Sequence, residues 1–467
     1  MNIIKNNLEY VHVDIRKISD ANLNQTVLLR GRVHTIRITG NIAFIILRYQ
    51  TSSLQVIASK KVIESNCIDN YKKLKLLTNE TIIDCIGTLR KSQVEIKSTS
   101  YKHYELDLLN FNIINISRQL PFQIDDANDY GESFRSDVKN NTKMEYRWMD
   151  LRTPVNNSIF KIRSSIINYF RTYLLENDFI EINTPKIIGV QSESGSQVFQ
   201  LDYFGESAFL AQSPQLYKQM AINSDFDKVF EIGPIFRAEN SVTTRHMCEF
   251  TGLDVEFVLS PNNNYNEIQE MLWNTITYIF DKLKVCNTNE ILYIKSKLPF
   301  DDPIYPKLPL IFKFNDCVEM LRKDGKEQSD FEDLSTINER RIGEIIKEQY
   351  NSDLFIINQY PTCVRPFYSM PNENNPKYSN SFDMIFRCVE ISSGAQRIHD
   401  YDLLFNKVIE NNINPNTLKY YLNSFSHGSL PHGGFGIGLD RLVSLYLGLS
   451  NVKMSSFCPR DPKRLFP

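Results

Sequence analysis

Residues 236–256 read FRAENSVTTRHMCEFTGLDVE, and residues 433–442 read GGFGIGLDRL. The first stretch has β-forming residues on both sides of a polar segment, Glu239 to Arg245, and predicts two strands joined by a loop that can reach a ligand. Arginine is planar, always charged and bidentate, which suits phosphate binding. The second stretch supplies glycine backbone that a ligand can approach closely, followed by Arg441 one turn into a predicted helix.

Composition sets broad limits on the chain. A length of 467 residues predicts two or three domains, and 42% hydrophobic with 23% charged residues is typical of a soluble globular protein. The net charge of −2 neither supports nor excludes a nucleic-acid partner, because charge can be local. The eight cysteines never form a CxxC pair, so the spacing of structural zinc sites is missing and free thiols in a reducing compartment are expected.

The first residues, MNIIKNNLEYVHVDIRK, carry charges where a secretory signal needs an apolar run. No Arg- and Ser-rich amphipathic leader is visible, and no stretch approaches the roughly 20 apolar residues of a membrane span. We therefore expect a cytoplasmic protein that does not enter a membrane.

Short β-like runs dominate the N-terminal part of the chain. They occupy 26–58, 80–92 and 104–117, separated by Gly, Asn, Thr and Ser turns. About five short strands in this space predict a small barrel, for which the five-stranded OB-fold is the common solution. We predict this domain over residues 1–118, followed by a Pro- and acid-marked connector over 119–150.

Residues 151–467 show a different pattern. Apolar residues from Ser158 to near Asn177 recur at helical spacing, and FIEINTPKI at 179–187 is an extended run stopped by Pro185. Further helices are predicted at 265–284 and 332–350. Strand-like runs are predicted at 228–236, 249–259, 353–360 and 382–391. They do not alternate regularly with helices, so we predict an α+β domain with a mostly antiparallel sheet and flanking helices.

The two opening stretches resemble motifs 2 (236–256) and 3 (433–447) of the class II aminoacyl-tRNA synthetases. Residues 158–189 are similar to motif 1, which forms the dimer interface of that class, and RDPKRL at 460–465 is typical of aspartyl enzymes. The resemblance implies a homodimer that activates L-aspartate with ATP and Mg²⁺ and transfers it to tRNA(Asp).

The resemblance also assigns an ATP site. Arg237 matches the arginine that holds the α-phosphate and the amino-acid carboxylate, and Arg441 matches the residue over the adenine and beside the γ-phosphate; both are the expected catalytic residues. The remaining expected ATP contacts are Glu239, Arg245, His246, Phe250 and Glu390. Taken singly, Arg237 is better explained by a strand-edge salt bridge and Phe250 by the protein core. Asp440 stands where the family more often has glutamate, and we expect this shortening to be tolerated.

Asp383 and Glu390 match the pair that holds Mg²⁺, a hard cation that takes one or two carboxylates from protein. Seven positions apart, they would lie on opposite faces of one straight strand, so a turn between them is required. The family usually has glycine at Cys388 and an acid at Val389, which leaves the geometry of this turn open.

The implied aspartate pocket is centred on two cations. Arg397 matches the arginine on the side-chain carboxylate, Lys218 the second cation, and Asp254 their ordering partner. Glu193 falls on a loop that closes over the α-ammonium group, and Gln215 and Ser393 complete the expected set. A surface ion-pair network would also explain such residues taken one at a time.

In the barrel, Phe44 and Gln55 match anticodon contacts, since an exposed aromatic can stack on an unpaired base. The alternative is that Phe44 belongs to the barrel core. Three rival functions remain: an asparaginyl-tRNA synthetase, a catalytically silent synthetase-like RNA-binding protein, and an ammonia-dependent asparagine synthetase. FTGLD, SGAQRIHD and RDPKRL weigh against the first, the retained arginines and acids against the second, and the barrel against the third.

Overall fold

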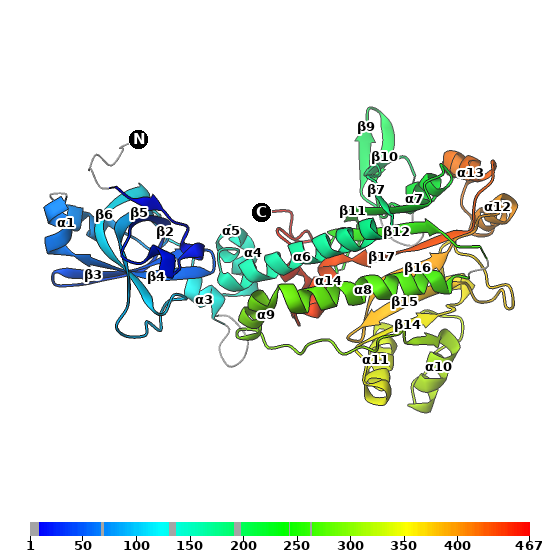
Figure 1. Cartoon of the computed structure of the whole chain (residues 1–467). Helices are drawn as coiled ribbons and strands as arrows, with labels where there is room; N and C mark the ends of the chain where they lie inside the picture. Colours follow the sequence, from blue (N-terminus) through cyan, green and yellow to red (C-terminus); the bar gives the residue numbers. More distant parts are fainter. Residues whose placement is uncertain (1–8, 67–69, 130–136, 191–197, 242, 262–263) are drawn as a thin grey trace. The chain divides into compact units, whose positions relative to one another are not determined.

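The computed structural model describes residues 9–66, 70–129, 137–190, 198–241, 243–261 and 264–467. The chain forms two compact units, Met1–Ser158 and Ile159–Pro467 (Figure 1). Among the described residues, none of the helices combines the length and the apolar character needed to cross a membrane.

The first unit contains a closed five-stranded barrel with one added edge strand, as the sequence predicts. The strands pair in the order β1-β2-β3-β4-β6-β5, and β5 closes onto β2. Their bounds are β1 (Val11–His12), β2 (Thr26–Thr39), β3 (Ile42–Tyr49), β4 (Ser52–Ser59), β5 (Ile82–Lys91) and β6 (Tyr104–Asn115). Along β3, Ala43, Ile45 and Leu47 are fully buried while Phe44 alternates outward. This period of two places an aromatic ring on the barrel surface.

Short helices complete the first unit. They are α1 (Lys60–Asn66), α2 (Asn70–Lys73), α3 (Ile124–Asn128), α4 (Asn140–Glu145) and α5 (Arg147–Asp150). Glu80, buried at a positive φ of 69°, ties the barrel to the connector: Arg48 of β3 and Arg152 both donate to its carboxylate, at 2.5 and 3.1 Å. The connector belongs to the same compact unit as the barrel, and this unit ends at Ser158. The predicted boundaries at 118 and 150 are therefore not tested by this division and stay predictions.

The second unit is built on a mixed sheet whose central strands are antiparallel. The strand order is β13-β14-β15-β16-β17-β12-β11-β7, and only the two edge pairs, β13–β14 and β11–β7, are parallel. The bounds are β7 (Ile180–Glu181), β11 (Lys228–Phe236), β12 (Glu249–Val258), β13 (Ile311–Lys313), β14 (Leu354–Asn358), β15 (Ser381–Phe386), β16 (Val389–Gln396) and β17 (His432–Gly438). A small sheet, in the order β8-β10-β9, lies in the same unit: β8 (Ile187–Ile188), β9 (Gln200–Tyr203) and β10 (Glu206–Leu210).

The predicted amphipathic helix is α6 (Pro154–Glu176), and its stripe Ile159, Ile162, Ile166, Phe170 and Leu174 is fully buried. In Figure 1, α6 and α8 run beside the sheet. The other helices are α7 (Gln215–Ile222), α8 (Asn266–Cys286), α9 (Thr288–Lys295), α10 (Phe314–Lys323), α11 (Thr336–Tyr350), α12 (Tyr401–Glu410), α13 (Lys419–Phe425) and α14 (Leu439–Tyr446).

Two of the differences between the predicted and the observed elements have a local physical cause. The helix predicted from 332 begins only at Thr336, because the Ser335 side chain caps it by accepting the Asn338 N–H. The run 382–391 is a hairpin, in which Arg387 and Cys388 form a two-residue turn with φ of 50° and 62°. Positive φ at both turn residues is the geometry that lets a two-residue turn follow the twist of the strands. The turn required between Asp383 and Glu390 therefore exists, with cysteine in a conformation that favours glycine.

Candidate active site

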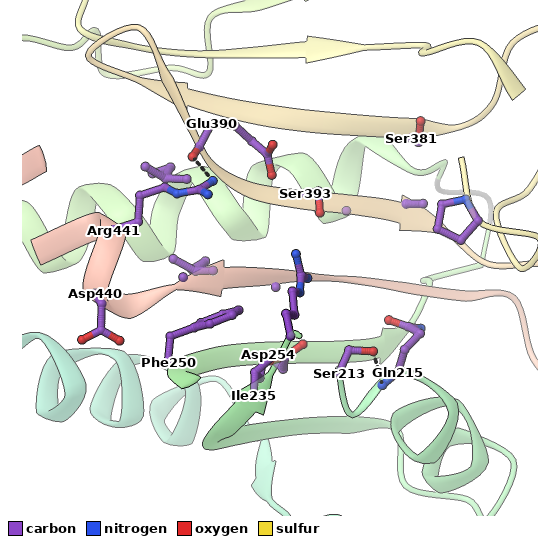
Figure 2. Close-up of a pocket in the computed structure, with 18 of the residues that line it drawn as sticks. Ser213, Gln215, Ile235, Phe250, Asp254, Ser381, Glu390, Ser393, Asp440 and Arg441 are labelled. Atoms are coloured by element: carbon purple, nitrogen blue, oxygen red, sulfur yellow. Dashed lines mark hydrogen bonds between the residues drawn. The ribbon is translucent and has the colours of Figure 1, made fainter. Parts of the chain in front are cut away.

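A cavity of about 240 Å³ opens over the sheet and is lined by residues of motif 2, of motif 3 and of the segments that carry Lys218, Glu390 and Arg397. Its lining includes most of the expected site residues: Gln215, Lys218, Arg237, Glu239, Arg245, His246, Phe250, Asp254, Glu390, Ser393, Arg397 and Arg441. In Figure 2, Phe250, Glu390 and Arg441 lie at one end and Ser213 and Gln215 at the other. The pocket therefore has two chemically distinct ends.

The floor of the pocket is made by β12, β17 and β16. Phe250, Asp254 and Glu256 share one face of β12 because side chains alternate along a strand. Gly436 pairs with Asp254, and Gly434 with Glu256, on β17. A Cβ on Gly434 would lie 2.0 Å from the Val255 carbonyl oxygen and 2.5 Å from Glu256 Oε2. Glycine is thus required where the two acids occupy the space above the neighbouring strand.

One end of the pocket is a buried network of two cations and two carboxylates. Lys218 Nζ lies 3.0 Å from Asp254 Oδ1 and 3.6 Å from Glu256 Oε2. Arg397 donates from Nε and Nη2 to the two oxygens of Glu256, at 2.9 and 3.2 Å. Burial opposes ionisation of Glu256, but Arg397 and Lys218 outweigh it and lower the pKa of this carboxyl. These residues form a buried network, and the alternative of a solvated surface network is wrong.

The opposite end joins the two arginines of the motifs to an aromatic ring. The Arg237 guanidinium lies 5.5 Å from the centre of the Phe250 ring, and Arg441 Nη1 donates to the Glu390 carbonyl oxygen at 2.9 Å. Arg237 lines the cavity with its side chain 40% exposed, and it makes a long ion pair of 3.9 Å with Glu239, so a salt bridge is present but leaves the guanidinium accessible from the pocket. Phe250 lines the cavity and is only partly buried, so the alternative that it is a core residue is wrong.

The loop between β11 and β12 contributes Arg245 and His246. Thr243 Oγ1 lies 2.7 Å from His246 Nδ1, and burial, with Arg441 nearby, lowers the pKa of His246. Arg245 Nη1 lies 3.8 Å from Oε1 of Glu339, a residue of α11. Burial raises the pKa of Glu339 to about 7, as does the neighbouring Glu390. The loop therefore places a cation beside Glu339, and an imidazole with a lowered pKa in the same part of the pocket.

Asp383 and Glu390 lie on neighbouring strands of the hairpin, but only Glu390 lines the cavity. Asp383 is buried beneath Arg365, whose Nη2 donates to Asp383 Oδ2 at 2.7 Å. Burial raises the pKa of Asp383 to about 7, and Arg365 opposes this shift. Asp383 Oδ1 is buried without a hydrogen-bond partner, which fits a nearby cation. Among the described residues, no group of three or more His, Cys, Asp or Glu side chains has the arrangement of a metal site.

Three expected residues lie elsewhere. Glu193 falls outside the described residues. Phe44 and Gln55 belong to the barrel, where Phe44 is 38% exposed and is not a core residue. Gln55 Nε2 donates to Glu105 Oε2 at 3.2 Å. The register of β3 and β4 places the side chains of Phe44 and Gln55 on the same face of the sheet.

The sequence analysis did not identify Glu256, Arg365 and Glu339, three of the residues in or next to the pocket. Glu256 was detectable, because it follows Asp254 by two positions on the same strand face. Arg365 lies in an irregular loop and Glu339 on a distant helix, and neither carries a local pattern that points to the site. Their positions come only from tertiary packing.

Comparisons with known proteins agree with this geometry. Residues 139–462 match the family model of tRNA synthetases class II (D, K and N), and residues 27–113 match an OB-fold nucleic acid binding domain. The human cytoplasmic aspartate–tRNA ligase is 41% identical, over 98% of this chain and 91% of the relative.

Two solved structures extend the comparison. An aspartyl-tRNA synthetase from Entamoeba histolytica superposes with a TM-score of 0.88 at 37% identity, covering 99% of this chain and 94% of that one. An asparaginyl-tRNA synthetase from Pyrococcus horikoshii, complexed with asparaginyl-adenylate, gives 0.84 at 26% identity, covering 97% and 99%. The fold is shared by both groups, and sequence identity favours the aspartyl group.

Proposed function

Because the chain belongs to the class II tRNA synthetases, and among them to the aspartate–tRNA ligases, we propose that its pocket joins L-aspartate to ATP and that the aspartyl group then passes to tRNA(Asp). The observation that carries this proposal is the buried pairing of Lys218 and Arg397 with Glu256 and Asp254. The relatives are named as cytoplasmic enzymes, and the chain is assigned to that compartment.

The cationic end binds the side-chain carboxylate of aspartate. Lysine and arginine only donate hydrogen bonds, so they offer donors to both oxygens of a carboxylate but no acceptor to an amide NH₂. Asp254 and Glu256 balance the two cations before substrate arrives, which holds both groups in place within a buried site. Gln215 and Ser393 line the same end.

The arginine end binds ATP. An oxygen of the aspartate α-carboxylate attacks the α-phosphorus in line, and the bond from that phosphorus to the pyrophosphate oxygen breaks. Arg237 and Arg441 neutralise the charge that builds up on the phosphoryl oxygens, which is the main demand of phosphoryl transfer. Phe250 supplies a flat face for adenine, while Glu239, Arg245 and His246 contact the nucleotide from the loop.

Mg²⁺ fits the residues at this end. Glu390 in the cavity and the unsatisfied Oδ1 of Asp383 behind it would hold the ion. When bound, Mg²⁺ supplies positive charge to the triphosphate oxygens.

The barrel binds the anticodon, where the exposed Phe44 ring stacks on a base and Gln55 contacts its edge. The chain acts as a homodimer through motif 1. This part of the proposal rests on family membership and on the exposed aromatic.

The test is ATP–pyrophosphate exchange with aspartate, asparagine or glutamate as the only amino acid. Exchange with aspartate alone supports the proposal, and exchange with asparagine would favour the asparaginyl alternative. Absence of exchange with all three would contradict both and favour a silent RNA-binding protein. An ammonia-dependent asparagine synthetase would instead release free asparagine from aspartate, ATP and ammonia without tRNA.

A further inference from the structure

A chain of hydrogen bonds behind the cationic end leads from Gln215 to His432. Gln215 Nε2 lies 3.1 Å from Gln219 Oε1 on the next turn of α7. Gln219 Nε2 lies 3.1 Å from His432 Nε2 on β17, and His432 Nδ1 lies 2.7 Å from the Leu430 carbonyl oxygen. Gln219 and His432 are fully buried. Burial at this level means that each polar atom must find a protein partner.

The direction of every bond in this chain follows from its far end. A carbonyl oxygen only accepts, so the hydrogen of His432 sits on Nδ1. Burial lowers the pKa of His432, and in the neutral ring Nε2 is then an acceptor. Gln219 must therefore present its NH₂ to His432 and its oxygen to the opposite side.

Two donors meet that oxygen. Tyr421 of α13 donates its hydroxyl to Gln219 Oε1 at 3.0 Å, and Gln215 Nε2 donates to the same atom. Gln215 Nε2 also lies 3.4 Å from Glu256 Oε2, an ionised carboxylate that only accepts. Gln219 Oε1 and Glu256 Oε2 are thus both acceptors, and both can bond only to the amide nitrogen of Gln215.

The side-chain oxygen of Gln215, Oε1, is therefore the atom that can accept a hydrogen bond from a ligand. Gln215 lines the cavity, and within the described part of the chain its Oε1 has no hydrogen-bond partner. Figure 2 shows Gln215 beside Ser213 at this end of the pocket. An amide oxygen fixed toward a cavity suits a cationic donor such as an ammonium group.

We infer that Gln219, Tyr421 and His432 are positioning residues that hold the Gln215 amide with its oxygen toward the pocket, as the acceptor for the ammonium group of the substrate. The inference rests on the proposed function, since it takes an amino acid as the ligand. The three residues touch no substrate and act only through Gln215.

The test compares two ligands that differ by the ammonium group. Q219M removes the oxygen that Gln215 donates to, at nearly the same side-chain length. We expect the KM for L-aspartate to rise about tenfold or more, because a hydrogen bond to a charged group is lost, while the KM for ATP stays within about twofold. The inhibition constant of succinate, which is aspartate without its ammonium group, should not change.

Q219E and Q93M complete the design. The carboxylate of Q219E still accepts from Gln215 and pairs with a protonated His432, so most of the aspartate affinity should return; this variant also serves if Q219M fails to fold. Q93M is the same substitution as Q219M at an exposed barrel position and should leave every constant unchanged.

The inference would be overturned if Q219M weakened the binding of aspartate and of succinate equally, or weakened neither. Failure to rescue by folded Q219E would also count against it. These outcomes are distinct from failure of the proposed function, which would appear as absence of aspartate-dependent exchange in the unmodified protein.

Discussion

Arg397 grips the fully buried carboxylate of Glu256 with two parallel hydrogen bonds, at 2.9 and 3.2 Å. The fork of a guanidinium matches the two oxygens of a carboxylate, so this pair fixes both the position and the plane of Arg397. Glu256 also lies 3.6 Å from Lys218, and one acid therefore orients both cations of the pocket.

The first prediction concerns E256Q. Removing one charge from a buried network costs about 3–5 kcal/mol, because Arg397 loses the carboxylate that it pairs with, while Lys218 keeps Asp254. We expect aspartate-dependent ATP–pyrophosphate exchange to fall by about two orders of magnitude or more and the unfolding temperature to drop. E95Q, which removes one partner of the exposed Lys102–Glu95 pair, is the control and should behave as the unmodified protein. Normal aspartate activation in E256Q would mean that Arg397 is held by other contacts.

R237A should separate chemistry from folding. Arg237 is 40% exposed and has only a weak ion pair with Glu239, so its loss should leave thermal unfolding nearly unchanged. Adenylate formation should fall by several orders of magnitude, because Arg237 neutralises the charge of the transition state. Single-turnover measurement of aspartyl-adenylate tests this, with R322A, at the exposed Arg322–Asp330 pair, as a surface control. Near-normal adenylate formation in R237A would contradict the role assigned to Arg237.

Replacing each of the two hairpin carboxylates, Glu390 and Asp383, with the corresponding amide should have different effects on Mg²⁺ dependence and on stability. E390Q should raise the Mg²⁺ concentration needed for exchange without changing stability, because its backbone oxygen still accepts from Arg441. D383N should destabilise the protein by about 3–5 kcal/mol, since it leaves the buried Arg365 without its partner. Urea unfolding and Mg²⁺ titrations of both variants measure these effects. Equal stability loss in the two variants would contradict the distinction.

Stability should fall in mild acid partly because of His432. Burial lowers its pKa below the ordinary 6.5, with Arg397 adding to the shift and Glu256 opposing it. Below pH of about 6.5 the unfolded chain binds a proton that the folded chain does not, so the free energy of unfolding falls as pH decreases, by about 1.4 kcal/mol for each unit of pKa depression. Urea unfolding of the protein and of H432Q at pH 8, 7, 6 and 5 gives the comparison. H432Q should show the flatter pH dependence, and parallel curves would argue against the shift.

F44A should affect tRNA and not amino-acid activation. Stacking of one base on an aromatic ring is worth about 1–3 kcal/mol, so the KM for tRNA(Asp) should rise about tenfold. Pyrophosphate exchange without tRNA should stay unchanged, as should both assays for V94A, an exposed position of the same unit. An unchanged KM for tRNA in F44A would remove Phe44 from the anticodon site.

Local sequence patterns predicted the fold class well because both units obey local rules. Alternation along residues 42–49 gives β3 its buried and exposed faces, and the three- and four-residue spacing of Ile159, Ile162 and Ile166 gives α6 its buried stripe. Boundaries were less accurate where a side chain intervenes, as at Ser335, whose cap delays the start of α11.

The hairpin turn shows a contact that no local pattern reveals. Arg387 adopts a positive φ of 50° in that turn, and its guanidinium donates to the carbonyl oxygens of Leu445 at 2.7 Å and Tyr446 at 3.3 Å, at the end of α14. This contact connects the turn that precedes β16, the strand of Glu390, to α14, the helix of Arg441.

The sequence by itself determined the barrel, the antiparallel sheet and the arginines and acids of the motifs, because strand and helix periodicities and motif spacing are properties of neighbouring residues. Only the tertiary structure decided that Glu256 orients both cations, that Arg365 covers Asp383, and that His432 sets the direction of the Gln215 amide. Those relationships join residues from different strands, helices and loops, and the burial that fixes their charges and hydrogen bonds exists only after the chain has packed.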